Sequence, residues 1–182
     1  MSNPASRMKP VSSMVNDGRA NPKGMAFLYL ASKKETAMAE VRPWIGSPIS
    51  LGHFKINRDI KIVDCSLYHG EQPFYFNVQK PEEEPDQDFI NKAVWTHIDN
   101  AFSQPVEMSQ SAIQYIPTQI IAELFKANGF DGIVYRSKFS DGYNIVLFDM
   151  NVADLVSCCL YEVEKINFDF KDQNNGYNVK RT

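Results

Sequence analysis

The chain has 182 residues, of which 43% are hydrophobic and 23% are charged, and its formal net charge is −3. These values are typical of one globular domain with a core, and they exclude whole-chain disorder. They leave no concentrated basic surface, so binding to nucleic acid is not expected. No apolar run approaches the roughly 20 residues that span a bilayer, so no membrane segment is expected either.

Residues 1–17 are polar and predict an arm that wraps the surface. This end of the chain lacks the apolar stretch of a secretion signal, which makes a reducing cytoplasm the default location. The cysteines agree, because Cys65, Cys158 and Cys159 are odd in number and form no CxxC pair. Neither a zinc site nor a disulfide framework is predicted, and small buried residues are the expected role.

A turn rich in glycine, asparagine and proline, residues 18–24, carries Arg19. The rigid guanidinium matches the geometry of a phosphate group, whereas an ion pair with a surface carboxylate is the plainer alternative. The apolar residues 25–31 then predict a buried strand, in which Tyr29 alone would usually be a core residue.

A short helix is predicted to follow this strand. Ser32 and Glu35 have the spacing of a capping box, the helix continues through residues 36–42, and Pro43 ends it. Glu40 lies at the edge of a helical stripe that we expect to be buried, formed by Ala37, Val41 and Trp44. A carboxylate in that position is either salt-bridged or functional.

The middle of the chain predicts strands at 54–56 and 60–67, then an acidic connector at 81–86. Asp86 and Asp88 favour a helix start. Residues at helical spacing then predict a long amphipathic helix, with Phe89, Ile90, Ala93, Val94, His97, Ile98, Ala101 and Phe102 on its apolar side. On that stripe His97 is predicted to be a packed core histidine.

A second long helix is predicted at 117–128, and Gly129 is expected to end it in the left-handed conformation. Its inward residues are expected to be Ile120, Ile121, Leu124 and Phe125. Two apolar strands, 132–135 and 144–148, predict a hairpin, and 157–163 and 166–170 predict edge strands.

This order of elements indicates an α+β fold rather than a doubly wound sheet. We expect a single domain at 18–170, preceded by the arm at 1–17 and followed by a flexible tail at 171–182.

Common catalytic signatures are missing, including GxSxG, GxGxxG, the phosphate loop and HExxH. Three histidines in unrelated contexts argue against a histidine-based metal site, and no metal is expected. Four residues remain as candidates: Arg19, Tyr29, Glu40 and Ser137. Each is a weak signal by itself, and only their ordered combination is informative.

That combination closely resembles the RES domain, a family named for an arginine, a glutamate and a serine. The resemblance covers about residues 18–149 and rests on the segments GRANPKG at 18–24, LYLAS at 28–32, ETAMAEV at 35–41, GFDGIVYRS at 129–137 and NIVLF at 144–148. It implies that Arg19, Glu40 and Ser137 are the naming trio and that Tyr29 matches the active-site tyrosine.

The resemblance also implies a fold similar to ADP-ribosyltransferases and a toxin that depletes cellular NAD. NAD would be a substrate, and no cofactor is expected. The implied partner is an Xre-type helix-turn-helix antitoxin, and a homodimer is left open.

The chemistry follows from the bond to be broken. Cleavage between nicotinamide and ribose leaves positive charge on the sugar, which the carboxylate of Glu40 would stabilise. Ser137 would hydrogen-bond the carboxamide or the ribose. We expect Arg19 and the backbone amides of its turn, which includes Asn21 and Gly24, to bind the pyrophosphate. Tyr29 would contact the nicotinamide, and Asn144 would support Ser137.

Three functions compete at this point: an NAD-degrading toxin with water or phosphate as acceptor, a protein ADP-ribosyltransferase, and a catalytically inactive binding domain. The four candidate residues weigh against the third. The first two differ only in the acceptor, which the shape of the pocket selects.

Overall fold

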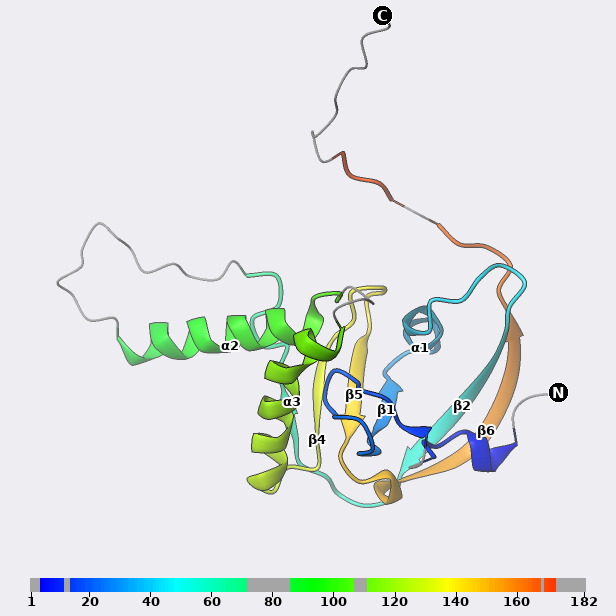
Figure 1. Cartoon of the computed structure of the whole chain (residues 1–182), viewed down its shortest axis with the longest axis horizontal. Helices are drawn as coiled ribbons and strands as arrows, with labels where there is room; N and C mark the ends of the chain where they lie inside the picture. Colours follow the sequence, from blue (N-terminus) through cyan, green and yellow to red (C-terminus); the bar gives the residue numbers. More distant parts are fainter. Residues whose placement is uncertain (1–3, 12–13, 72–85, 107–110, 168, 173–182) are drawn as a thin grey trace, which may run out of the picture.

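The computed structural model describes residues 4–11, 14–71, 86–106, 111–167 and 169–172. In chain order its elements are η1 (Ala5–Arg7), β1 (Leu28–Ala31), α1 (Lys34–Glu40), β2 (Pro48–Ile56), β3 (Ile62–Asp64), α2 (Gln87–Ser103), α3 (Ser111–Ala127), β4 (Gly132–Arg136), β5 (Tyr143–Leu147), η3 (Met150–Val152) and β6 (Ala153–Glu162) (Figure 1).

The strands form two sheets. The central sheet has the order β1-β5-β4-β3, in which β5 is antiparallel to both neighbours and β3 is parallel to β4. Strands β2 and β6 form a separate antiparallel pair. Helices α2 and α3 lie on one side of the central sheet, and the β2–β6 pair lies beyond β1 (Figure 1). The expected α+β fold, with a mixed sheet in a single domain, is confirmed.

The core has two parts, one on each face of the central sheet. On the face toward α2 and α3, Ile133 lies opposite Val146, and both pack with Phe102 of α2 and Ala122 of α3. On the other face, Leu28 lies opposite Leu147, and both pack with residues that begin β6. By the same register Tyr29, Tyr135 and Asn144 point toward the α2–α3 side.

Several predicted boundaries were wrong. Strand β2 begins at Pro48, β3 spans only three residues, and no strand occupies 166–170 within the described residues. Helix α3 runs through Pro117 instead of beginning there, and the residues near the proline contact Arg19: the guanidinium lies over the Tyr115 ring, and Thr118 donates to the Arg19 carbonyl. The connector at 81–86 and the tail at 171–182 lie largely outside the described residues.

Several burial predictions were also wrong. His97 is exposed, and the buried polar residues of α2 are Thr96, Asp99 and Ser103 instead. In both long helices the face that is buried differs from the predicted one. Each helix has more than one apolar stripe, and hydrophobic spacing does not determine which of them packs against the sheet. The apolar residues expected to be buried but found exposed are Val41, Trp44, Ile90, Val94, Ile120, Leu124 and Cys159.

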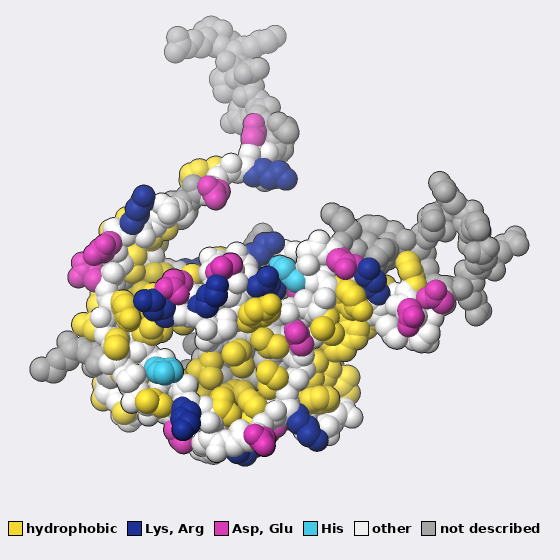
Figure 2. Space-filling view, turned by 180° about the vertical axis from the view of Figure 1, so that it is seen from behind, with side chains coloured by type: hydrophobic (Ala, Val, Ile, Leu, Met, Phe, Trp, Pro, Cys, Tyr) yellow, Lys and Arg dark blue, Asp and Glu magenta, His cyan; other side chains and the backbone are white. Residues whose placement is uncertain are grey.

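Part of the surface is therefore strongly apolar. Seen from behind Figure 1, hydrophobic side chains gather over the lower middle of the molecule, with charged side chains around them (Figure 2). No helix in the described ranges combines the length and the apolar character that crossing a bilayer requires.

Candidate active site

Glu40 is the last residue of α1, and its side chain reaches the β4–β5 hairpin. The Ser137 hydroxyl donates to Glu40 Oε1 over 2.7 Å, and the Asn144 side-chain amide donates to the same oxygen over 2.6 Å. Ser137 and Asn144 are both buried. Among the described residues no hydrogen bond reaches the second oxygen, Oε2, so one half of the carboxylate is held and the other is available to a ligand.

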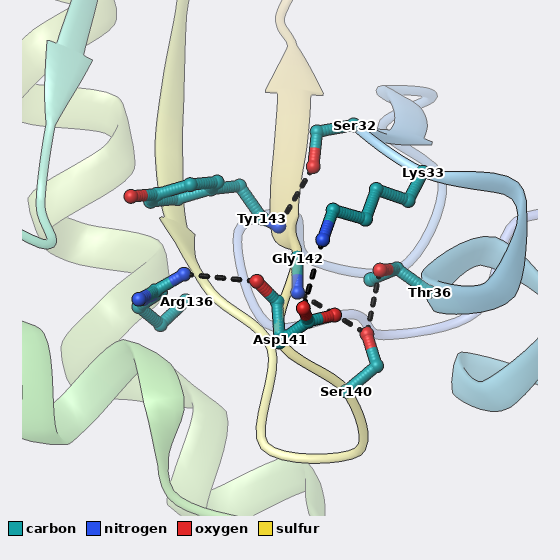
Figure 3. A network of polar contacts seen from close by, with 8 residues as sticks. All are labelled: Ser32, Lys33, Thr36, Arg136, Ser140, Asp141, Gly142 and Tyr143. Atoms are coloured by element: carbon teal, nitrogen blue, oxygen red, sulfur yellow. Dashed lines mark hydrogen bonds and ion pairs between the residues drawn. The ribbon is translucent and has the colours of Figure 1, made fainter.

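A network of polar contacts fastens α1 to the hairpin (Figure 3). The hydroxyls of Thr36 and Ser140 lie 2.6 Å apart, and Lys33 forms an ion pair with Asp141 at 2.8 Å. Gly142 faces Thr36 so closely that a Cβ atom there would overlap the Thr36 hydroxyl. The distance between the helix that carries Glu40 and the strands that carry Ser137 and Asn144 is therefore set by direct contact.

The predicted capping box is wrong. Helix α1 begins at Lys34, its N-cap is Lys33, and no side chain caps it. The Ser32 hydroxyl instead accepts from the backbone N–H of Tyr143 at 2.9 Å, while the Ser32 N–H donates to the Tyr143 carbonyl (Figure 3). The serine thus extends the β1–β5 pairing, a long-range use that local spacing does not reveal.

Arg19 lies beside the C-terminal end of α2. Its guanidinium donates to the carbonyls of Ala101, at 2.9 Å, and Gln104, at 2.6 Å, and it lies over the ring of Tyr115. The plain alternative, an ion pair with a surface carboxylate, is not what the structure shows. The cation satisfies free carbonyls at the negative end of a helix dipole, and it also lines the cavity described below.

The Tyr29 hydroxyl forms hydrogen bonds with the turn that carries Arg19. Its hydroxyl donates to Asn21 Oδ1 at 2.8 Å and accepts from the N–H of Ala20 at 3.0 Å. Desolvation of this hydroxyl raises the Tyr29 pKa to about 12, although 41% of the residue remains exposed. Gly18 is required here because a Cβ atom would lie 2.7 Å from the tyrosine oxygen.

A small cavity of about 20 Å³ lies beside Glu40. Its lining includes Arg19, Glu40, Phe102, Ser103, Pro105, Tyr135, Arg136, Lys138, Phe139 and Asn144. The cavity thus places one carboxylate among three cationic residues, although it has only the size of a water molecule.

The predicted site residues separate into two groups. Arg19, Glu40, Ser137 and Asn144 meet at the cavity or bond directly to Glu40. Asn21 is buried and both ends of its amide are bonded, to the Asn16 carbonyl and the Tyr29 hydroxyl. Gly24 lies exposed at a positive φ of 86°, and its N–H donates to the Val15 carbonyl. Asn21, Gly24 and Tyr29 hold the turn and do not line the cavity.

Several residues at the site were not predicted from the sequence. Thr118 donates to the carbonyl of Arg19 at 2.6 Å, and Gln119 donates to the carbonyls of Gly18 and Asn21. Helix α3 thereby holds the Arg19 turn, which nothing in the local sequence of α3 indicates. Lys138 and Phe139 line the cavity, and their position directly after Ser137 could have pointed to them.

A larger groove of about 1020 Å³ lies on the opposite side of α1. Its wall is mainly apolar and includes Met38, Trp44, Ile49 and Tyr161. Phe139 borders both the groove and the small cavity, and Arg42 packs over its ring at 4.7 Å with a left-handed φ of 45°. Strained residues of this kind occur frequently beside functional sites.

The fold and the site together define a single α+β domain with one carboxylate oriented by a serine and an asparagine and surrounded by cations. A family model, the RES domain, matches residues 4–171, so the chain belongs to the RES domain family. This family is associated with toxin–antitoxin systems. Searches of curated proteins and of solved structures find no match. The likeness to ADP-ribosyltransferases therefore stays a prediction.

Proposed function

We propose that this protein cleaves the nicotinamide–ribose bond of NAD. The observation that carries the proposal is the geometry of Glu40, whose Oε1 is fixed by Ser137 and Asn144 while Oε2 is left open. A preorganised anion of this kind stabilises the positive charge that develops on the ribose as nicotinamide leaves.

The cations around the cavity supply the complementary half of the site. Arg19 and Lys138 would hold the pyrophosphate, and the half-exposed ring of Tyr29 would wall the nicotinamide pocket. In this conformation the cavity takes no more than a water-sized group, so NAD binding must open it. We infer that Phe139, which is exposed on the hairpin loop, moves aside.

The orientation of Glu40 also refines the role of Ser137. The sequence predicts that Ser137 bonds the carboxamide or ribose of the substrate, with Asn144 in support. In the structure both residues donate to Glu40. We therefore propose that they act as positioning residues, which keep the carboxylate aimed at the sugar.

The decisive experiment incubates purified protein with NAD, with and without phosphate, and identifies what carries the ADP-ribose. Free ADP-ribose indicates hydrolysis, ADP-ribose phosphate indicates phosphorolysis, and label on protein indicates transferase activity. The variant Glu40→Gln keeps an oxygen for Ser137 and Asn144 but loses the charge. It should be slower by about 10²–10³-fold.

Two results would refute the proposal. One is NAD that stays intact with the wild-type chain, as an inactive binding domain would leave it. The other is a Glu40→Gln variant as fast as wild type. An Xre-type antitoxin is the partner that family membership favours, and we propose it on that ground alone.

A further inference from the structure

Helix α3 exposes a continuous apolar face. Ile113, Ile116, Ile120 and Leu124 are exposed to 75%, 49%, 64% and 58%. A helix at the surface of a monomeric protein normally places charged side chains there. At the exposed positions of α3 that the structure describes, Gln114 is the only polar side chain.

The opposite face of α3 packs against the rest of the domain. Thr118 and Gln119 hold the Arg19 turn, Ala122 is buried in the core, and Phe125 packs against it. The helix therefore cannot rotate to bury its outer face without breaking these contacts. Among the residues that the structure describes, none covers the stripe, and we consider a second copy of the chain as its cover.

The stripe has the properties of a surface that meets its own copy. Its residues are separated by three and four positions, which is the spacing at which two helices pack side by side. The charged residues of α3 are Glu123 and Lys126, which pair with each other at 3.6 Å beside the stripe. The opposite charges of α3 are thus paired within one chain, and the stripe itself carries no charged side chain.

The exposed area fits a weak, reversible association. From their exposed fractions, the four residues leave roughly 450–500 Å² of surface per chain, and a symmetric pair would bury at most about 900–1,000 Å², which is below the about 1,200 Å² at which standard specific interfaces begin. Pro117 lies on the same exposed face and adds to that area.

We propose that the protein forms a homodimer through the stripe Ile113, Ile116, Ile120 and Leu124 of α3, packed against the same stripe of a second copy. This proposal does not depend on NAD chemistry. It has a consequence for the site, because dimerisation would immobilise the helix whose inner face holds the Arg19 turn.

The test measures the mass of the full chain by sedimentation equilibrium from about 1 to about 100 µM. The mass of wild-type protein should rise with concentration and approach twice the mass of one chain at the highest concentration. Ile120→Glu places a charge at the centre of the stripe and should weaken the dimer at least about 100-fold. Val156→Glu is the matched control, because Val156 on β6 is 59% exposed and lies outside the stripe.

Circular dichroism and thermal melting should show that Ile120→Glu folds like wild type, since the substituted side chain is exposed. Ile116→Glu provides a second variant in the same stripe and should also give monomers. The proposal is overturned if wild type remains monomeric at the highest concentration, if either stripe variant stays dimeric, or if Val156→Glu dissociates as well.

Discussion

Glu40 occupies an unfavourable place for a carboxylate, because it ends α1 at the pole where the helix dipole repels negative charge. Its stability there depends on the two donors at Oε1 and on the surrounding cations. At the residue scale, then, the proposed site consists of the carboxylate and its two donors.

Removing either donor should impair turnover more than binding. In Ser137→Ala and in Asn144→Ala, Glu40 retains its charge but loses one of the two hydrogen bonds that orient it. We therefore expect kcat to fall by up to about 10²-fold while KM changes little. Steady-state consumption of NAD measures both parameters. Asn128→Ala, an exposed change at the end of α3, is the control, and a kcat unchanged in both site variants would contradict the positioning role.

The Tyr29 hydroxyl predicts a pH dependence of stability. Its pKa is raised from 10.0 to about 12, mainly by desolvation, so the folded state retains this proton where the unfolded state has lost it. The contribution of this hydroxyl to the free energy of unfolding is therefore complete below pH 10.0 and is lost as the pH rises toward 12. Urea unfolding of wild type between these values should show a falling free energy of unfolding. The fall should be shallower in Tyr29→Phe, and equal slopes would refute the assignment.

At the scale of elements, the important contact is the one between α1 and the β4–β5 hairpin (Figure 3). The helix has only seven residues and no side-chain cap, so it could not hold a fixed position by itself. Thr36, Ser140 and the close approach of Gly142 anchor it to the strands that carry the donors. These contacts, which we call the α1 clamp, bring together site residues from two elements that are distant in the chain.

Gly142→Ala should break the clamp. The added methyl group overlaps Thr36 and must push α1 away from the hairpin, which we expect to cost about 1–3 kcal/mol and to reduce NAD cleavage through displacement of Glu40. Urea denaturation and the activity assay measure the two effects. Ser140→Ala removes one hydrogen bond without a clash and should cost only about 1 kcal/mol. A Gly142→Ala variant as stable as Ser140→Ala would show that α1 is not clamped there.

At the scale of the whole molecule, α2, α3 and the Arg19 turn cover one face of the central sheet, and residues of η3, β2 and the start of β6 pack on the other. The cavity lies where Glu40 of α1 meets the β4–β5 hairpin and the C-terminal end of α2. A ligand there would contact three elements at once and should stabilise the whole domain.

Binding of NAD should therefore raise the melting temperature. With Glu40→Gln, which should bind NAD and consume it only slowly, a concentration of about 100 times Kd corresponds to about 2.7 kcal/mol, or about 5–10 °C in a domain of this size. Thermal melting with and without NAD measures the shift. The double variant Glu40→Gln, Lys138→Ala removes one cation of the cavity and should show a smaller shift, whereas no shift in either protein would argue against binding.

The sequence by itself determined the type of fold, the hairpin and the family to which the chain belongs. The hairpin follows from two apolar runs separated by a polar loop, and Gly129 ends α3 at a positive φ of 80° as expected. The order of Arg19, Glu40 and Ser137 was enough to indicate the RES family, which the family model confirms. These features are local, so propensity and motif order express them directly.

Only the tertiary structure decided which partners these residues have. Ser32 bonds Tyr143 instead of capping α1, His97 faces solvent, and Thr118 and Gln119 hold a turn about a hundred residues earlier in the chain. Each of these placements depends on which helical face packs against the sheet and on contacts between segments distant in the chain. The free energy of those contacts comes from packing the whole domain, so no local stretch of sequence encodes it.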